Sequence, residues 1–147
     1  MAVARTIPRL GVSIMIRRHP DGDFLLVKRG RPPAKGMWAF PGGKVEFGET
    51  LAEGAARELR EETAIHLPPT AFTHNAHVEL IQHDDGGHVV SHFVLMVMQA
   101  SVEANVTPVA GDDADDVRFC AADDMDPNTV TPSTRERAKL AGPFKQS

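Results

Sequence analysis

The chain switches between two hydrophobic periods. A period of two residues predicts a strand, and apolar residues at i, i+3 and i+4 predict a helix. The first predicted strand has Val12, Ile14 and Ile16 on one face. Strands are predicted over residues 9–17, 24–28, 72–83, 88–100 and 117–120. Helices are predicted over residues 121–125 and 133–140, and another helix is predicted to end in the run at 57–62. Helices interspersed with strands in this order predict an α+β domain, in which helices flank a mixed sheet.

Turn-forming residues separate the predicted elements. The sequence His-Pro-Asp-Gly at residues 19–22 is typical of a turn and joins the first two strands. A second turn, Asp-Asp-Gly-Gly at residues 84–87, joins strands 72–83 and 88–100 into a hairpin. The return strand of this hairpin is rich in apolar residues, so we expect it to be central in the sheet.

The helix that ends at residues 57–62 carries an unusual concentration of acid. Glu58, Glu61 and Glu62 stand at i, i+3 and i+4 and therefore project from one face. Like charges at this spacing repel by roughly 0.2–0.5 kcal/mol per pair. A hard divalent cation such as Mg²⁺ or Mn²⁺, which prefers oxygen ligands, would turn that repulsion into attraction. The alternative is a solvated helix of mixed charge, which is the commoner meaning of such a run alone.

Length, charge and cysteine content narrow the class of protein. We expect residues 1–147 to form a single domain, because this length is enough for a core of its own. The net charge of −4 argues against a basic surface that binds nucleic acid. The single cysteine, Cys120, rules out a disulfide framework and is interpreted as a small buried hydrophobe. No segment resembles a signal peptide or a membrane span, so we expect a cytoplasmic protein without a membrane partner.

Five histidines fall in the predicted hairpin, and they are candidates for a metal site. They occupy positions 74, 77, 83, 88 and 92. This spread lacks the compact ligand spacing of a metal site, so we interpret them as structural or surface residues. His88 and His92 share strand parity and are the pair best placed to line a cleft.

Fixed spacing upstream of the acidic run changes its interpretation. Gly43 is followed after five residues by Glu49, and after seven more by Arg-Glu-Leu-Arg-Glu-Glu at 57–62. This resembles the signature of the Nudix hydrolases, G-x5-E-x7-R-E-U-x-E-E-x-G-U, where U is aliphatic. Every position matches except the last glycine, which is Ala64 here. Helices commonly end there in a left-handed residue, so either Ala64 adopts that conformation at a cost of roughly 1–2 kcal/mol or the helix continues.

The resemblance covers nearly the whole chain in order and implies the Nudix fold, an α/β/α sandwich. In the family, the glutamate and arginine that match Glu49 and Arg57 form a pair that ties the loop to the helix. The implied metal shell for Mg²⁺ or Mn²⁺ consists of the carbonyl of Gly42 with the carboxylates of Glu58, Glu61 and Glu62.

The resemblance also implies catalytic and substrate-binding residues. Glu58 and Glu61 are the expected catalytic carboxylates, with Glu58 the first choice for the general base and the acidic loop at 112–116 the second. The expected substrate-binding residues are Arg29, Trp38, Gly43, Asp112, Asp113 and Asp116. Three alternatives stay open: Arg29 as an ordinary strand-end charge, Trp38 as a core residue, and the acidic loop as a solvated turn.

The expected reaction is Mg²⁺-dependent hydrolysis of the pyrophosphate bond in a nucleoside diphosphate linked to a group X. The string AGDDADDVRF at residues 110–119 resembles the family branch that cleaves ADP-ribose and related sugar nucleotides. One alternative is a nucleoside triphosphate pyrophosphohydrolase that cleans the nucleotide pool, and another is a sensor without turnover. The expected partner is a small nucleotide rather than a nucleic acid; the oligomeric state is left open, with a homodimer as one alternative.

Overall fold

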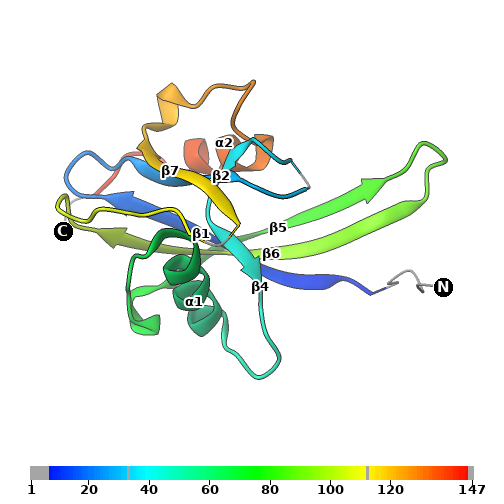
Figure 1. Cartoon of the computed structure of the whole chain (residues 1–147), viewed down its shortest axis with the longest axis horizontal. Coiled ribbons are helices and arrows are strands. Elements are labelled where there is room, and N and C mark those ends of the chain that lie inside the picture. The colour runs from blue at the N-terminus through cyan, green and yellow to red at the C-terminus, as the bar shows by residue number, and fades with distance from the viewer. Residues whose placement is uncertain (1–6, 33, 112, 146–147) are drawn as a thin grey trace.

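The computed structural model describes residues 7–32, 34–111 and 113–145, and a seven-stranded sheet runs through it (Figure 1). Its strands are β1 (Arg9–Arg18), β2 (Phe24–Arg29), β3 (Trp38–Ala39), β4 (Gly42–Lys44), β5 (Thr73–His83), β6 (Val89–Val102) and β7 (Ala114–Cys120). The α-helices are α1 (Leu51–Thr63) and α2 (Pro132–Ala141). Single turns of 3₁₀-helix lie at Pro69–Ala71 and Ala122–Asp124.

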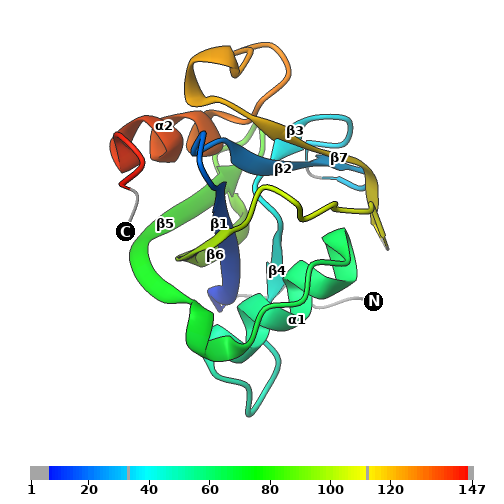
Figure 2. The same ribbon diagram turned by 90° about the vertical axis from the view of Figure 1, so that its left-hand side faces the viewer.

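The sheet is mixed. Its main path runs β3-β2-β1-β6-β5, with β4 paired to β1 and β7 paired to β2. Strands β1 and β6 are parallel, and the other pairs are antiparallel. Figure 2 shows α1 and α2 on opposite sides of the strands. The predicted α+β sandwich is therefore confirmed.

The alternation in β1 produces two cores. Val12, Ile14 and Ile16 are at most 1% exposed and pack on the α1 side. Met15, of opposite parity, packs on the α2 side with Phe24. Burial of one such side chain stabilises the fold by about 1.5–3 kcal/mol at most, so β1 anchors both layers.

Local signals set both ends of α1. The side chain of Thr50 accepts a hydrogen bond from the backbone N–H of Glu53 at 3.1 Å, and the Glu53 carboxylate accepts one from the N–H of Thr50 at 3.0 Å. This reciprocal capping box satisfies N–H groups that would otherwise lack partners. At the other end, Ala64 is left-handed, with φ 61° and ψ 12°. Of the two alternatives for Ala64, the structure adopts the first, and the helix ends at Thr63.

Two predicted elements have wrong bounds, and two short strands were not predicted. The strand predicted at 117–120 begins at Ala114, because the acidic residues before it pair with β2, with Asp116 opposite Lys28. The helix predicted at 121–125 is only the 3₁₀ turn Ala122–Asp124. The short strands β3 and β4 were not predicted, since two or three residues show no periodicity.

The hairpin of β5 and β6 extends beyond both helices (Figure 1). Strand β6 lies between β1 and β5, as its apolar sequence predicts. Its outer part is nevertheless exposed, with Val89 at 57% and Val90 at 62%. The apolar pattern of β6 predicts its central place in the sheet. It does not predict where along β6 the packing of β1 and the helices ends. In the part of the chain that the structure describes, no helix is long and apolar enough to cross a membrane.

Candidate active site

Helix α1 holds the acidic face against the turn at Gly42 and Gly43. Leu59 is fully buried and fixes the helix on the sheet, so its neighbour Glu58 is directed toward β4. A Cβ atom on Gly43 would collide with the carboxylate of Glu58, and one on Gly42 would collide with the carbonyl oxygen of Val12. Gly42 therefore requires glycine because backbone lies against it, whereas a side chain at Gly43 would force the Glu58 carboxylate to shift.

Arg57 links the loop at residues 45–50, between β4 and α1, to the helix. Its Nε lies 2.8 Å from Oε2 of Glu49, and its Nη2 lies 2.9 Å from Oε1 of the same carboxylate. The Glu49–Arg57 pair that the resemblance implies is thus present, in the bidentate form that suits a guanidinium. The Nη1 group of Arg57 also donates to Glu58 at 2.8 Å and to Glu61 at 3.3 Å, and Nη2 donates to the carbonyl of Lys44.

The acidic face carries more negative charge than its surroundings balance. Burial, followed by the charge of Glu58, raises the pKa of Glu62 to about 8, although the N–H of Gly42 donates to its Oε2 at 3.3 Å. Burial also raises the pKa of Glu58, and the hydrogen bond from Arg57 offsets part of this shift. One arginine thus faces several carboxylates, two of which are costly to ionise without further positive charge.

These donors suit a hard divalent cation by type. Carboxylate and carbonyl oxygens are the ligands that Mg²⁺ and Mn²⁺ prefer. In the described ranges, however, no three acidic, cysteine or histidine side chains are grouped to hold an ion. Glu58 and Glu61 are instead bound to Arg57. Cation binding would therefore require side-chain rotation, which is easiest for Glu61, whose side chain is 40% exposed.

The segment before β7 reaches the same end of α1. The N–H of Gly111 donates to the carbonyl of Glu62 at 3.0 Å, and the N–H of Gly30 donates to the carbonyl of Asp113 at 2.8 Å. An ion pair of 2.7 Å joins Arg31 to the Asp113 carboxylate. The charge of Asp113 contributes to the raised pKa of Glu62, and the charge of Arg29 opposes it.

Some of the expected substrate-binding residues lie beside the acidic face and others lie away from it. Arg29, Gly43 and Asp113 lie beside the acidic face, whereas Asp112 falls outside the described residues. Asp116 is exposed on β7, where its carboxylate accepts a hydrogen bond from the N–H of Val117. Trp38 is only 9% exposed, in the α2-side core, and this favours the core alternative. Its part in substrate binding stays a prediction.

The structure contains several side-chain contacts that the sequence analysis did not predict. The guanidinium of Arg118 lies 4.2 Å from the centre of the Trp38 ring and covers it. The pairing of Arg31 with Asp113 was missed, because residues so far apart in sequence give no local signal. The capping box was also missed, although Thr-x-x-Glu before an apolar stripe is a recognised sequence signal. Cys120 is 8% exposed, which confirms its interpretation as a buried hydrophobe.

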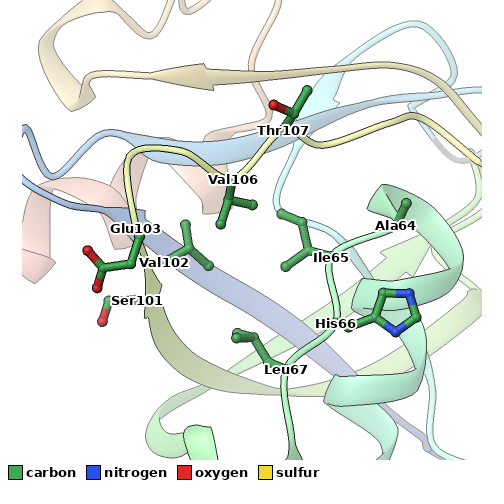
Figure 3. A pocket seen from close by; sticks show the side chains of 9 residues that line it. All are labelled: Ala64, Ile65, His66, Leu67, Ser101, Val102, Glu103, Val106 and Thr107. Atoms are coloured by element: carbon green, nitrogen blue, oxygen red, sulfur yellow. The ribbon is translucent and has the colours of Figure 1, made fainter.

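Two hollows lie outside the acidic face. The larger, of about 400 Å³, lies between residues 64–67 and 101–107, and Figure 3 shows Ile65, Leu67, Val102 and Val106 directed toward one another within it. None of the carboxylates of the acidic face lines this hollow. The smaller, of about 20 Å³, lies between Phe40 and Arg137 on the α2 side and has room for about one water molecule. Neither hollow competes with the acidic face as a catalytic site.

Comparisons with known proteins agree with this geometry. Residues 7–140 match the model of the NUDIX domain. The ADP-ribose pyrophosphatase of Methanocaldococcus jannaschii is 37% identical over 113 residues, which are 76% of this chain and 61% of that protein. A shorter match, 39% identical over 66 residues, is to human m7GpppN-mRNA hydrolase NUDT17 and covers 44% of this chain and 20% of that protein. The chain thus spans less than two thirds of these curated relatives.

Solved structures give the same family. The crystal structure of a MutT NUDIX hydrolase from Burkholderia pseudomallei is 32% identical, with a TM-score of 0.76 over 90% of this chain and 97% of that one. The NUDIX domain of Shewanella oneidensis NrtR, complexed with ADP ribose, is 22% identical, with a TM-score of 0.73 over 94% and 88% of the two chains. The second likeness shows the fold alone. With the family model matching most of its length, the chain belongs to the Nudix domain family.

Proposed function

We propose that this chain is a pyrophosphohydrolase that uses Mg²⁺ or Mn²⁺ to cleave the diphosphate of a nucleoside diphosphate linked to X, with ADP-ribose as the first candidate. The observation that carries the proposal is the set of carboxylates held by α1 against Gly42 and Gly43. Glu62 in that set is shielded enough to raise its pKa to about 8. The name of the Methanocaldococcus jannaschii relative, ADP-ribose pyrophosphatase, supports the choice of substrate.

The cation is assigned to the carbonyl of Gly42 and the carboxylates of Glu58, Glu61 and Glu62. When bound, it supplies positive charge for the diphosphate oxygens and for the charge that develops on them during transfer to water. Arg57 holds Glu49, Glu58 and Glu61 in one network and so orients the acidic face before binding. Cation binding would then require Glu58 and Glu61 to rotate from Arg57 toward the ion, while Glu49 stays paired with Arg57.

Glu58 is the first choice for the general base. Its raised pKa makes it a better proton acceptor than an ordinary glutamate near neutral pH. Glu61 is the second catalytic carboxylate on the same face. Asp113 is the alternative base, because it approaches Glu62 from the segment before β7. In either case the carboxylate takes the proton of the attacking water while the phosphoanhydride P–O bond breaks.

The substrate is assigned to the side of the site formed by β2 and the segment before β7. Arg29 is proposed to contact the phosphates, because its charge already reaches Glu62. Gly43 is proposed to contact a phosphate through its backbone, and the space that a Cβ would take is filled by the Glu58 carboxylate. Asp112, Asp113 and Asp116 are proposed to shape the side that holds the second sugar. Water adds across the diphosphate, so ADP-ribose would give AMP and ribose 5-phosphate.

A substrate panel tests the assignment. Purified protein with Mg²⁺ is offered ADP-ribose, other sugar nucleotides and nucleoside triphosphates, and products are identified by chromatography. We expect ADP-ribose to be cleaved fastest. Preferred cleavage of a triphosphate with release of pyrophosphate would favour pool cleaning, and tight binding of ADP-ribose without products would favour a sensor. A cytoplasmic location and a homodimeric state are also proposals, for cell fractionation and mass measurement respectively.

A further inference from the structure

Arg137 of α2 carries a buried nitrogen that nothing in the proposed activity uses. Within the described ranges, its Nε is the one buried side-chain nitrogen or oxygen that has no hydrogen-bond partner. The ion pairs between described residues do not include Arg137 either. Leaving a buried donor of a charged group without an acceptor is costly, and buried polar groups in native proteins are nearly always paired. The position therefore calls for an acceptor.

The hollow of about 20 Å³ beside Arg137 is lined by two further donors. Ser13 of β1 and Ser133 of α2 line it, and neither hydroxyl forms a hydrogen bond with any other described residue. Ser133 and Arg137 stand at i and i+4 and therefore share one face of α2. Ser13 has the parity of Met15, which packs on the α2 side of the sheet. Donors from the helix and from the sheet thus line one small space.

The charge beside this hollow is positive. No aspartate or glutamate lines it, and its remaining walls include the apolar side chains of Phe40, Val78 and Val97. Arg137 is only partly exposed, so water screens its charge incompletely. A water molecule in the hollow would accept the hydrogen bond of Nε but would leave that charge unbalanced. A monovalent anion would accept the hydrogen bond and balance the charge as well.

We propose that the hollow binds one chloride ion, held by Nε of Arg137 and by the hydroxyls of Ser13 and Ser133. The hollow has room for a particle of about the size of a water molecule, which admits a halide and excludes larger anions such as sulfate and phosphate. Its apolar walls disfavour an anion that must keep its hydration shell. The site lies on the α2 side of the sheet, opposite α1 and its carboxylates, and does not depend on the proposed activity (Figure 2).

A chloride ion in this place would tie α2 to the sheet. Helix α2 has the mostly polar sequence PSTRERAKLA, and only Thr134 and Ala138 within it are buried. Few apolar side chains therefore hold the helix, and an ion between Ser133, Arg137 and Ser13 would add a bridge from α2 to β1. An ion that binds the folded state alone raises Tm as its concentration exceeds Kd, and the effect is specific to ions that fit.

Thermal unfolding in sodium chloride and in sodium gluconate of equal ionic strength tests the proposal. For a Kd on the order of 20 mM, Tm of wild type should be about 3–6 °C higher in about 200 mM chloride than in gluconate. Arg137→Met keeps a long side chain without the donor and should abolish this difference. Ser13→Ala removes one hydrogen bond and should raise Kd about three- to tenfold.

Arg135→Met is the matched control on the same helix. Nε of Arg135 already donates to the carbonyl of Val130 at 3.2 Å, and Arg135 does not line the hollow. This variant should keep the difference between the two salts. Equal Tm values for wild type in chloride and gluconate, or loss of the difference in both arginine variants, would overturn the proposal.

Bromide locates the ion in wild-type crystals and requires no variant to fold. Bromide replaces chloride in halide sites and is identified by its anomalous scattering. We expect an anomalous peak between Arg137, Ser13 and Ser133. A map without a peak there would mean that the hollow holds water alone and would refute the proposal. A peak without a chloride-dependent Tm in solution would mean an adventitious ion only, bound at crystal concentration, and would refute it too.

Discussion

Replacement of Ala64 by glycine tests the helix end at which this chain departs from the family signature. Ala64 has φ 61° and donates its N–H to the carbonyl of Arg60 at 2.9 Å. Its own side chain is exposed, so removing the methyl group costs little buried area. The left-handed conformation costs alanine about 1–2 kcal/mol, and glycine does not bear this cost.

The expected gain is smaller than the strain itself. Glycine also makes the unfolded chain more flexible, which returns about 0.4–1 kcal/mol. The free energy of unfolding should therefore rise by about 0.5–1 kcal/mol. For a domain of this length, that corresponds to an increase of about 1–4 °C in Tm. Because no carboxylate moves, kcat should stay within a factor of about two.

Thermal and urea unfolding of three proteins would decide the matter. Ala56→Gly is the matched control, since Ala56 lies inside α1, where glycine should destabilise by about 1 kcal/mol. Opposite signs for Ala64→Gly and Ala56→Gly are expected. If Ala64→Gly lowers Tm as Ala56→Gly does, the helix does not end in a left-handed residue at this position.

Three further predictions concern the acidic face. The folded state holds the Glu62 proton more tightly than the unfolded chain does, because the pKa of Glu62 is raised to about 8. Without metal, the contribution of Glu62 to the free energy of unfolding should therefore be greatest below about pH 4.5 and fall as the pH rises through about 8. Urea titrations at several pH values should show this slope in wild type and a flatter one in Glu62→Gln. Arg57→Lys loses the bidentate contact with Glu49 and should cost about 1.5–3 kcal/mol in urea unfolding, with unchanged stability refuting the network. Gly43→Ala places a Cβ against the Glu58 carboxylate and should lower kcat at least about tenfold with the circular dichroism spectrum preserved; a wild-type rate would contradict that close packing.

The parts of the molecule that follow local rules could be predicted from sequence. The period of two in β1 predicts its two faces, and the i, i+3, i+4 spacing places Glu58, Glu61 and Glu62 together on α1. The Glu49–Arg57 pair is implied by the resemblance to the family signature, and the structure contains it. In each case the partners are close in sequence, so geometry is fixed before tertiary packing.

The parts that depend on distant segments could not be predicted in the same way. The start of β7 at Ala114 depends on pairing with β2, which overrides an acidic composition typical of a loop. The Arg31–Asp113 pair joins residues from different strand ends, and no pattern marks it. Trp38 had two interpretations of equal weight, and contact with Arg118 and the α2-side core favours one of them.

The central claim is that the carboxylates of α1 would hold a divalent cation, whose charge this chain would use in hydrolysing a diphosphate. The most direct test is the turnover of ADP-ribose with and without that cation. Wild type and Glu62→Gln are compared in EDTA and after excess Mg²⁺, with AMP and ribose 5-phosphate measured. We expect no products in EDTA, full recovery with Mg²⁺ in wild type, and a kcat at least about 10²-fold lower in Glu62→Gln. Full turnover in EDTA, or a wild-type rate for Glu62→Gln, would contradict the claim.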